Sequence, residues 1–110
     1  MSQWTTICQY QDLTPNTGIC ALFESEHVAI FYCKRSEQLY AVSNIDPIAN
    51  ASVLSRGIMA SLEDQMYVAS PLYKQHFNLK TGACLEAPEH ALKVYGIRRV
   101  NNDIQLNQAV

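Results

Sequence analysis

Long hydrophobic runs are missing from this sequence. The longest run, Val28 to Cys33, is far shorter than the roughly 20 apolar residues of a membrane-crossing helix. The segment from Met1 to Tyr10 also lacks the cationic stretch followed by an apolar one that is typical of export signals. Charge of one sign is missing too, since eight Lys and Arg face ten Asp and Glu, for a net charge of -2. We therefore expect a cytoplasmic protein that binds neither membrane nor nucleic acid.

Motifs of independent catalysis are also missing. The sequence has no G-x-S-x-G nucleophile motif, no glycine-rich loop that could cradle a phosphate, and no cysteine with a plausible histidine relay in the same segment. Four cysteines are scattered along the chain and none forms a C-x-x-C pair, which favours buried free thiols over disulfides or a metal site. We expect no activity of the chain by itself.

The composition is that of a compact globular protein. The chain has 110 residues, of which 48% are hydrophobic and 16% are charged. A chain of this length can bury one core but has little room for a separate substrate cleft and lid. The expectation is a single domain spanning residues 1–110.

Short segments rich in β-branched and aromatic residues dominate the sequence, and turn signals separate them. The expected strands are Trp4–Cys8, Ile19–Phe23, His27–Cys33, Gln38–Val42, Gln65–Ala69, His76–Leu79, Gly96–Val100 and Asp103–Leu106. The first four have short connections, which predicts an antiparallel meander, and Asn101-Asn102 predicts a hairpin between the last two. No window carries a clean helical stripe; residues 12–15 and 49–54 could hold a single turn each. The prediction is a mainly β fold, a small antiparallel sandwich or barrel.

Two stretches look like binding loops. The first is SNIDPIANASVLSRGI, from Ser43 to Ile58, and the second is SPLYKQHFNLKTGACLEAP, from Ser70 to Pro88. Both resemble the cluster-binding loops of Rieske iron–sulfur domains. The matching residues are Leu54, Ser55 and Gly57 in the first stretch, and Pro71, Phe77, Leu79, Thr81 and Gly82 in the second. The resemblance implies a Rieske-like antiparallel β sandwich or barrel with a cluster-loop subdomain.

The four ligand positions depart from the Rieske pattern. By the resemblance, Asn44 and Asp46 stand where the first Cys and His belong, and Ser70 and Tyr73 stand where the second pair belongs. A Rieske [2Fe–2S] cluster needs two thiolates and two imidazoles, which these side chains cannot supply. Since His76 and Cys84 lie beyond the tip of the second stretch, they do not replace the missing ligands. We expect no metal and no cofactor in this chain.

A Rieske-like domain that keeps both loops and lacks all four ligands resembles the small subunits of cytoplasmic NAD(P)H-dependent nitrite reductases. In that family the large subunit carries FAD, a [4Fe–4S] cluster and sirohaem, and reduces nitrite to ammonium. The resemblance implies an accessory, non-catalytic subunit that docks on the large catalytic subunit. Four residues near the loops are candidates for partner contacts: Arg56, Tyr73, Lys74 and His76.

Other interpretations stay open at this point. The chain could be a Rieske-type electron-transfer domain with non-standard metal ligands, or a stand-alone regulatory module whose basic loops bind a small anion. Asn44 and Asp46 could order their loop by hydrogen-bonding its backbone, as such side chains commonly do before proline, or contact the partner, or both.

Overall fold

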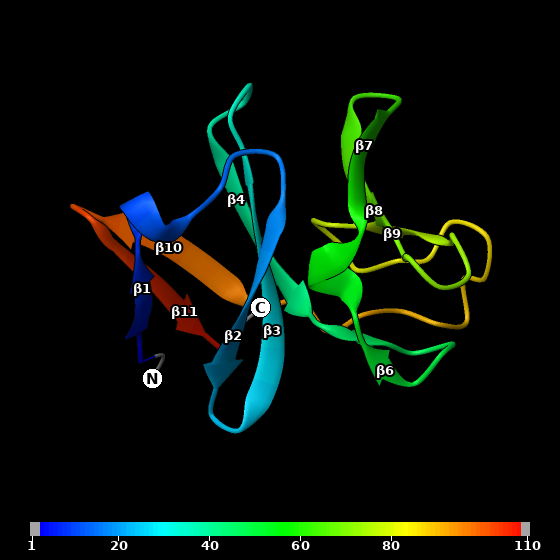
Figure 1. Ribbon diagram of the computed structural model, residues 1–110, viewed down its shortest axis with the longest axis horizontal. Helices are drawn as coiled ribbons and strands as arrows, with labels where there is room; N and C mark the ends of the chain where they lie inside the picture. Colours follow the sequence, from blue (N-terminus) through cyan, green and yellow to red (C-terminus); the bar gives the residue numbers. More distant parts are fainter. Residues whose placement is uncertain (1–2, 109–110) are drawn as a thin grey trace.

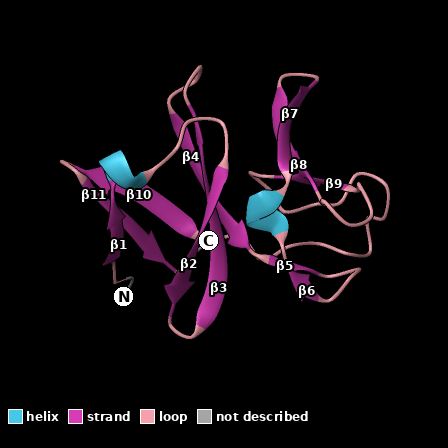
Figure 2. Cartoon of the chain, viewed as in Figure 1, coloured by secondary structure: helices cyan, strands magenta, loops and turns pink. Residues whose placement is uncertain are grey.

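The computed structural model describes residues 3–108, and in this part of the chain the structure is built almost entirely from antiparallel strands (Figure 2). One three-stranded sheet has the order β1-β11-β10, formed by Thr5–Gln9, Asp103–Asn107 and Gly96–Val100. A second has the order β2-β3-β4, formed by Gly18–Phe23, Glu26–Cys33 and Gln38–Ser43. A third has the order β7-β8-β9, formed by Ile58–Leu62, Gln65–Ala69 and His76–Asn78. A two-stranded ribbon, β5 (Ile45–Asp46) with β6 (Ala51–Ser52), completes the set.

The mainly β prediction is confirmed, but the meander begins one strand later than expected. Strands β2, β3 and β4 do pair in sequence. Strand β1 instead pairs with β11, so segments from the two ends of the chain share a sheet (Figure 1). A 3₁₀ turn at Tyr10–Asp12 follows β1, and the Tyr10 amide donates to the Asn102 carbonyl across this sheet. This contact holds β1 against the final hairpin instead of against β2.

The central strand β3 faces two cores at once. Its side chains alternate: Val28, Ile30 and Tyr32 belong to one buried cluster, and Ala29 and Phe31 belong to another. A strand buried on both faces has a continuous hydrophobic sequence, which explains the longest apolar run of the chain.

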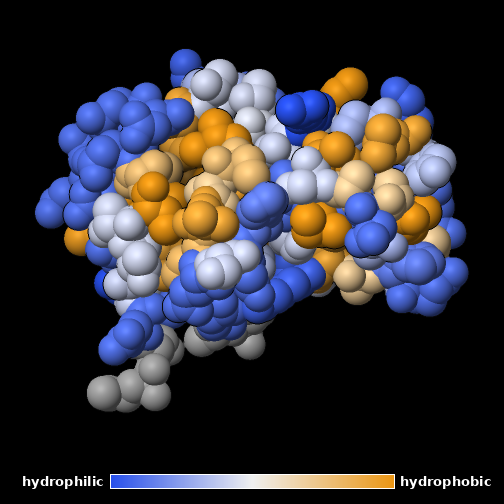
Figure 3. All heavy atoms as spheres, turned by 60° about the horizontal axis from the view of Figure 1, so that its bottom comes forward, coloured by the Kyte–Doolittle hydropathy of each residue, from blue (hydrophilic) through white to orange (hydrophobic). Residues whose placement is uncertain are grey.

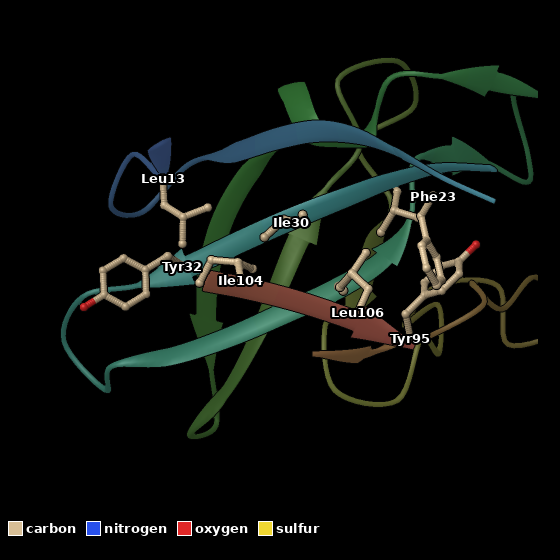
Figure 4. Close-up of a cluster of buried hydrophobic side chains, with 9 residues drawn as sticks. Leu13, Phe23, Ile30, Tyr32, Tyr95, Ile104 and Leu106 are labelled. Atoms are coloured by element: carbon tan, nitrogen blue, oxygen red, sulfur yellow. The ribbon is translucent and has the colours of Figure 1, made fainter. Parts of the chain in front are cut away.

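The first core lies between sheet β2-β3-β4 and sheet β1-β11-β10, where Ile30 and Tyr32 meet Ile104 and Leu106 (Figure 4). The second core lies on the other face of β3 and holds the loop region. Its buried members are Ala29, Phe31, Val42, Leu54, Val68, Phe77, Leu79, Cys84 and Leu92. Because Leu54 is fully buried here, the second core anchors the chain segment that follows β6.

The turns between the strands agree only in part with those expected from the sequence. The hairpin at Asn101 is confirmed, with a positive φ of 56° at that residue. Gly82 has a φ of 83°, the left-handed conformation that the turn after β9 requires. The single helical turns were misplaced, since they lie at Tyr10–Asp12 and at Leu54–Arg56 (η2), where three-residue 3₁₀ turns form. Among residues 3–108, no helix is long and apolar enough to span a bilayer.

The four cysteines are free thiols, as expected, but not all are buried. Cys33 and Cys84 are buried, whereas Cys8 is half-buried and Cys20 is exposed. Cys20 points outward because its neighbours Ile19 and Ala21 on β2 pack against the first core and strand alternation sends it to the opposite side.

Candidate functional site

The two loops that resemble a cluster site lie next to each other at one end of the molecule. The first loop comprises residues 44–57 and contains β5, β6 and η2; the second loop comprises residues 70–75, between β8 and β9. Figure 1 places β6 and the turn η2 on the same half of the molecule as the β7–β8 hairpin. A Cβ atom added at Gly57 would lie 2.4 Å from the Ala69 carbonyl oxygen, so the end of the first loop is pressed against β8.

Asp46 joins the two loops. Its side chain is fully buried, and one carboxylate oxygen accepts the hydroxyl proton of Ser70 at 2.5 Å. The other oxygen accepts the amides of Ile48 at 2.8 Å and Ala49 at 3.1 Å, which closes the turn after Asp46-Pro47. Three donors from both loops therefore converge on this one buried side chain. The sequence had placed Asp46 and Ser70 at two of the four family ligand positions, and here they bond to each other.

Asn44 orders the first loop from within. It is buried, its side-chain oxygen accepts the Ser55 amide at 2.6 Å, and its amide group donates to the Ser52 hydroxyl at 2.8 Å. Its main-chain carbonyl accepts the amides of Val53 and Leu54. The Ser52 hydroxyl also lies 2.9 Å from His27 Nδ1, so this network extends to β3. The sequence contained no signal for the role of Ser52, because a serine in a polar loop is ordinary.

The second loop is a tight turn with an exposed tip. The Ser70 amide donates to the Gln75 carbonyl, and the Lys74 amide donates to the Ser70 carbonyl, while Lys74 has a positive φ of 65°. This closure leaves Tyr73 58% exposed and Lys74 exposed. Tyr73 therefore stands apart from Asn44, Asp46 and Ser70, which are all buried. The four positions do not form one cluster of side chains.

His76, at the start of β9, is paired with Glu86. The His76 amide donates to one Glu86 carboxylate oxygen at 2.7 Å, and His76 Nδ1 lies 2.7 Å from the other. Partial burial raises the pKa of the Glu86 carboxyl, but the hydrogen bonds from the His76 amide and ring outweigh it, so the pKa lies below its ordinary value. The sequence indicates the contact between His76 and Glu86 only through the turn at Gly82, which brings the chain back along β9.

A lowered folded-state pKa makes the contribution of Glu86 pH-dependent. That contribution is fully present above the unfolded pKa of about 4.3 and is lost as pH falls through the folded pKa. We expect Glu86→Gln to lower the free energy of unfolding at pH 7, and the difference from wild type to shrink below about pH 4.3. Urea unfolding between pH 3 and 7 measures this, with the exposed Glu89→Gln as the matched control. A difference in the free energy of unfolding that stays constant down to pH 3 would contradict the lowered pKa of Glu86.

The side chains at the four positions do not fit a [2Fe–2S] cluster. The polar atoms of Asp46 and Ser70 are engaged with each other, and both ends of the Asn44 amide are engaged within the first loop. Amide, carboxylate and hydroxyl groups are hard ligands, whereas Rieske centres need thiolates and imidazoles. Among residues 3–108, no group of three or more His, Cys, Asp and Glu side chains is arranged to hold a metal ion.

Three of the four candidates for partner contacts are exposed in the two loops, and the fourth is less accessible. Arg56 is exposed at the end of η2 in the first loop, and Tyr73 and Lys74 are exposed in the second loop. His76 is less accessible, with 31% of its side chain exposed.

Comparison with known proteins extends over nearly the whole chain. The model of the Rieske-like [2Fe–2S] domain family matches residues 3–107. The nitrite reductase (NADH) small subunit of Salmonella typhimurium is 48% identical over 106 residues, which cover 96% of this chain and 98% of that protein. The NMR structure of the E. coli protein NirD superposes with a TM-score of 0.90 at 45% identity and covers all of both chains.

A further relative has a different organisation. The nitrite reductase [NAD(P)H] large subunit of Klebsiella oxytoca is 31% identical over 101 residues, which cover 92% of this chain but 10% of that protein. A domain similar to this chain is therefore part of a much longer polypeptide there. The chain belongs to the Rieske-like [2Fe–2S] domain family and, within it, to the nitrite reductase small subunits.

Proposed function

We propose that this chain is the accessory small subunit of a cytoplasmic NAD(P)H-dependent nitrite reductase. In this proposal it docks on the large catalytic subunit and supports it, and it holds no [2Fe–2S] cluster of its own. The reduction of nitrite to ammonium, with the FAD, [4Fe–4S] and sirohaem groups that the family resemblance implies, belongs to the large subunit. The observation that carries the proposal is the 48% identity to a nitrite reductase small subunit over almost the full length of both chains.

The donor set supports the part of the proposal that concerns the cluster. In place of an inorganic group that joins two loops, the chain has a buried carboxylate and a hydroxyl that join them directly. The Asp46–Ser70 contact gives the loops a connection that needs no metal, and their shape is then available for another use. Binding to a partner is the use that the relatives favour.

The relative from Klebsiella supports the identity of the partner. A domain similar to this chain lies within a protein named as the large subunit, and makes up 10% of its length. Two units that are joined in one organism as a single polypeptide are expected to associate when they are separate chains. Of the alternatives, the electron-transfer domain is favoured only by the name of the matching family.

Association can be tested with the two purified chains. Size-exclusion chromatography of this chain with the large subunit should give a complex in which both chains elute together. The proposal expects nitrite-dependent NAD(P)H oxidation from the complex and none from this chain alone. Separate elution at all concentrations would contradict the docking role, and activity of the isolated chain would contradict the accessory role.

A further inference from the structure

The sheet β7-β8-β9 has one buried face and one open face. The rung Met59–Val68–Phe77 runs across the three strands, and Val68 and Phe77 are fully buried in the second core. Cross-strand partners lie on the same face of a sheet, and neighbouring rungs alternate between faces. The next rung, Ile58–Ala69–His76, therefore points to the opposite side.

Leu85 extends this open rung by one position. The bridge between Phe77 and Cys84 adds a fourth segment beside β9, and the Leu85 amide donates to the His76 carbonyl. Cys84 is buried with Phe77, so Leu85 lies on the open side, next to His76. The residues side by side on the open face are thus Ile58, Ala69, His76 and Leu85.

The open face carries several apolar side chains, two of them highly exposed. Ile58 is 72% exposed and Leu85 is 55% exposed. Alternation along β7, β8 and β9 also places Ala60, Leu62, Gln65 and Tyr67 on this side, together with Asn78, which is buried. We name the apolar residues of this surface the outer face: Ile58, Ala60, Leu62, Tyr67, Ala69 and Leu85. Figure 3 shows hydrophobic residues in several surface clusters, some of them on the half of the molecule that carries β6 to β9.

Exposed apolar rows of this kind mark interaction surfaces, and charged residues are depleted from the centres of stable interfaces. No Lys, Arg, Asp or Glu stands at any position of β7, β8 or β9 on this side, where the polar residues are Gln65, His76 and Asn78. The one titratable side chain within the rung, His76, is paired with Glu86 beside it. Two more exposed hydrophobic side chains, Leu72 at 50% and Tyr73 at 58%, lie in the second loop, which directly follows Ala69 on β8.

We propose that the outer face of sheet β7-β8-β9, and not the tip of the cluster-like loops alone, is the surface that docks on the large catalytic subunit. The inference rests on the proposed function, since it names the surface through which that association occurs. The Klebsiella relative indicates which partner covers this face. In that protein, a domain similar to this chain makes up 10% of a polypeptide named as the large subunit. A domain held permanently beside that partner is expected to cover an apolar face against it.

Charge placed on the outer face tests the proposal. The double variant Ile58→Glu/Leu85→Glu changes two highly exposed side chains, so its thermal midpoint should match that of wild type. We expect its affinity for the purified large subunit to be at least about 100-fold weaker in a surface-immobilised binding assay. The matched control is Leu22→Glu, a change at a residue that is 67% exposed on β2, outside the outer face, which should leave the affinity within about twofold.

Each result has a distinct meaning. Loss of binding in the double variant, with wild-type binding retained in Leu22→Glu, supports the outer face. Unchanged binding in the double variant overturns the inference and leaves the proposed function standing. Failure of the wild-type chain to bind the large subunit overturns both. If wild type alone forms a dimer that the double variant abolishes, the occupant is a second copy of this chain, and the inference is wrong.

Discussion

Replacing Asp46 by alanine should lower the free energy of unfolding by about 3 kcal/mol. The change removes a fully buried carboxylate and leaves three donors without their acceptor, namely the Ser70 hydroxyl and the amides of Ile48 and Ala49. Small domains are stable by about 5 to 15 kcal/mol, so this is a large fraction of the total. Chemical unfolding at pH 7, followed by fluorescence of Trp4, measures the loss.

Two further variants separate the link between the loops from the turn within the first loop. Asp46→Asn keeps an oxygen for the two amides and an amide group that can donate to Ser70, so we expect a loss of about 1 to 2 kcal/mol. Ser70→Ala leaves the turn at Ile48 and Ala49 intact, but removes the contact between the loops and the hydroxyl that accepts the Leu72 amide at 3.3 Å, and should cost about as much. In a double-mutant cycle, Asp46→Ala and Ser70→Ala should couple strongly because they share one bond. Additive losses would show that the two loops are not joined by this pair.

Replacing Leu54 by alanine should cost about 3 kcal/mol, within the range of about 2 to 5 that is typical of buried leucines. Leu54 is fully buried in the second core although it lies in a short turn of the first loop. Its loss would leave a cavity against β2 and β3, which η2 contacts, and would release the first loop from the body of the molecule.

The matched control for Leu54 is the same substitution on the surface. Leu22→Ala removes the same atoms from a side chain that is 67% exposed, and should change the free energy of unfolding by no more than about 0.5 kcal/mol. Urea unfolding of both variants measures the difference. Equal losses would mean that Leu54 is not an anchor of the loop.

The strands with strong β-branched and aromatic patterns could be predicted from the sequence, and β8 and β10 have the bounds expected for them. Strand β7 was missed, because its connection to β8 is a turn at Glu63-Asp64 with φ values of 51° and 65°. Such turns usually contain asparagine or glycine, so the acidic pair did not mark a hairpin. The two-residue strands β5 and β6 are too short to leave a pattern.

The candidate site was predictable only in part. The positions of Asn44, Asp46 and Ser70 in the two loops could be assigned from the motif, and the loop-ordering role of Asp46 follows from an acidic residue before proline. The bond between Asp46 and Ser70 joins residues 24 positions apart, and no local pattern encodes such a contact. The outer face could not be predicted for a related reason. The row Ile58–Ala69–His76–Leu85 is formed by four segments of the chain, and it can be recognised only when the register of their pairing is known.

Analysis of iron and acid-labile sulfide in this chain tests most directly whether it functions without a cluster. The chain should be purified in complex with its large subunit under anaerobic conditions and then separated from it. We predict a stable complex before separation, and iron and sulfide that remain with the large subunit, with less than about 0.1 mole of each per mole of this chain. Two iron and two sulfide retained per small chain would contradict the proposed absence of a cluster and make this subunit an electron carrier with ligands outside the expected set.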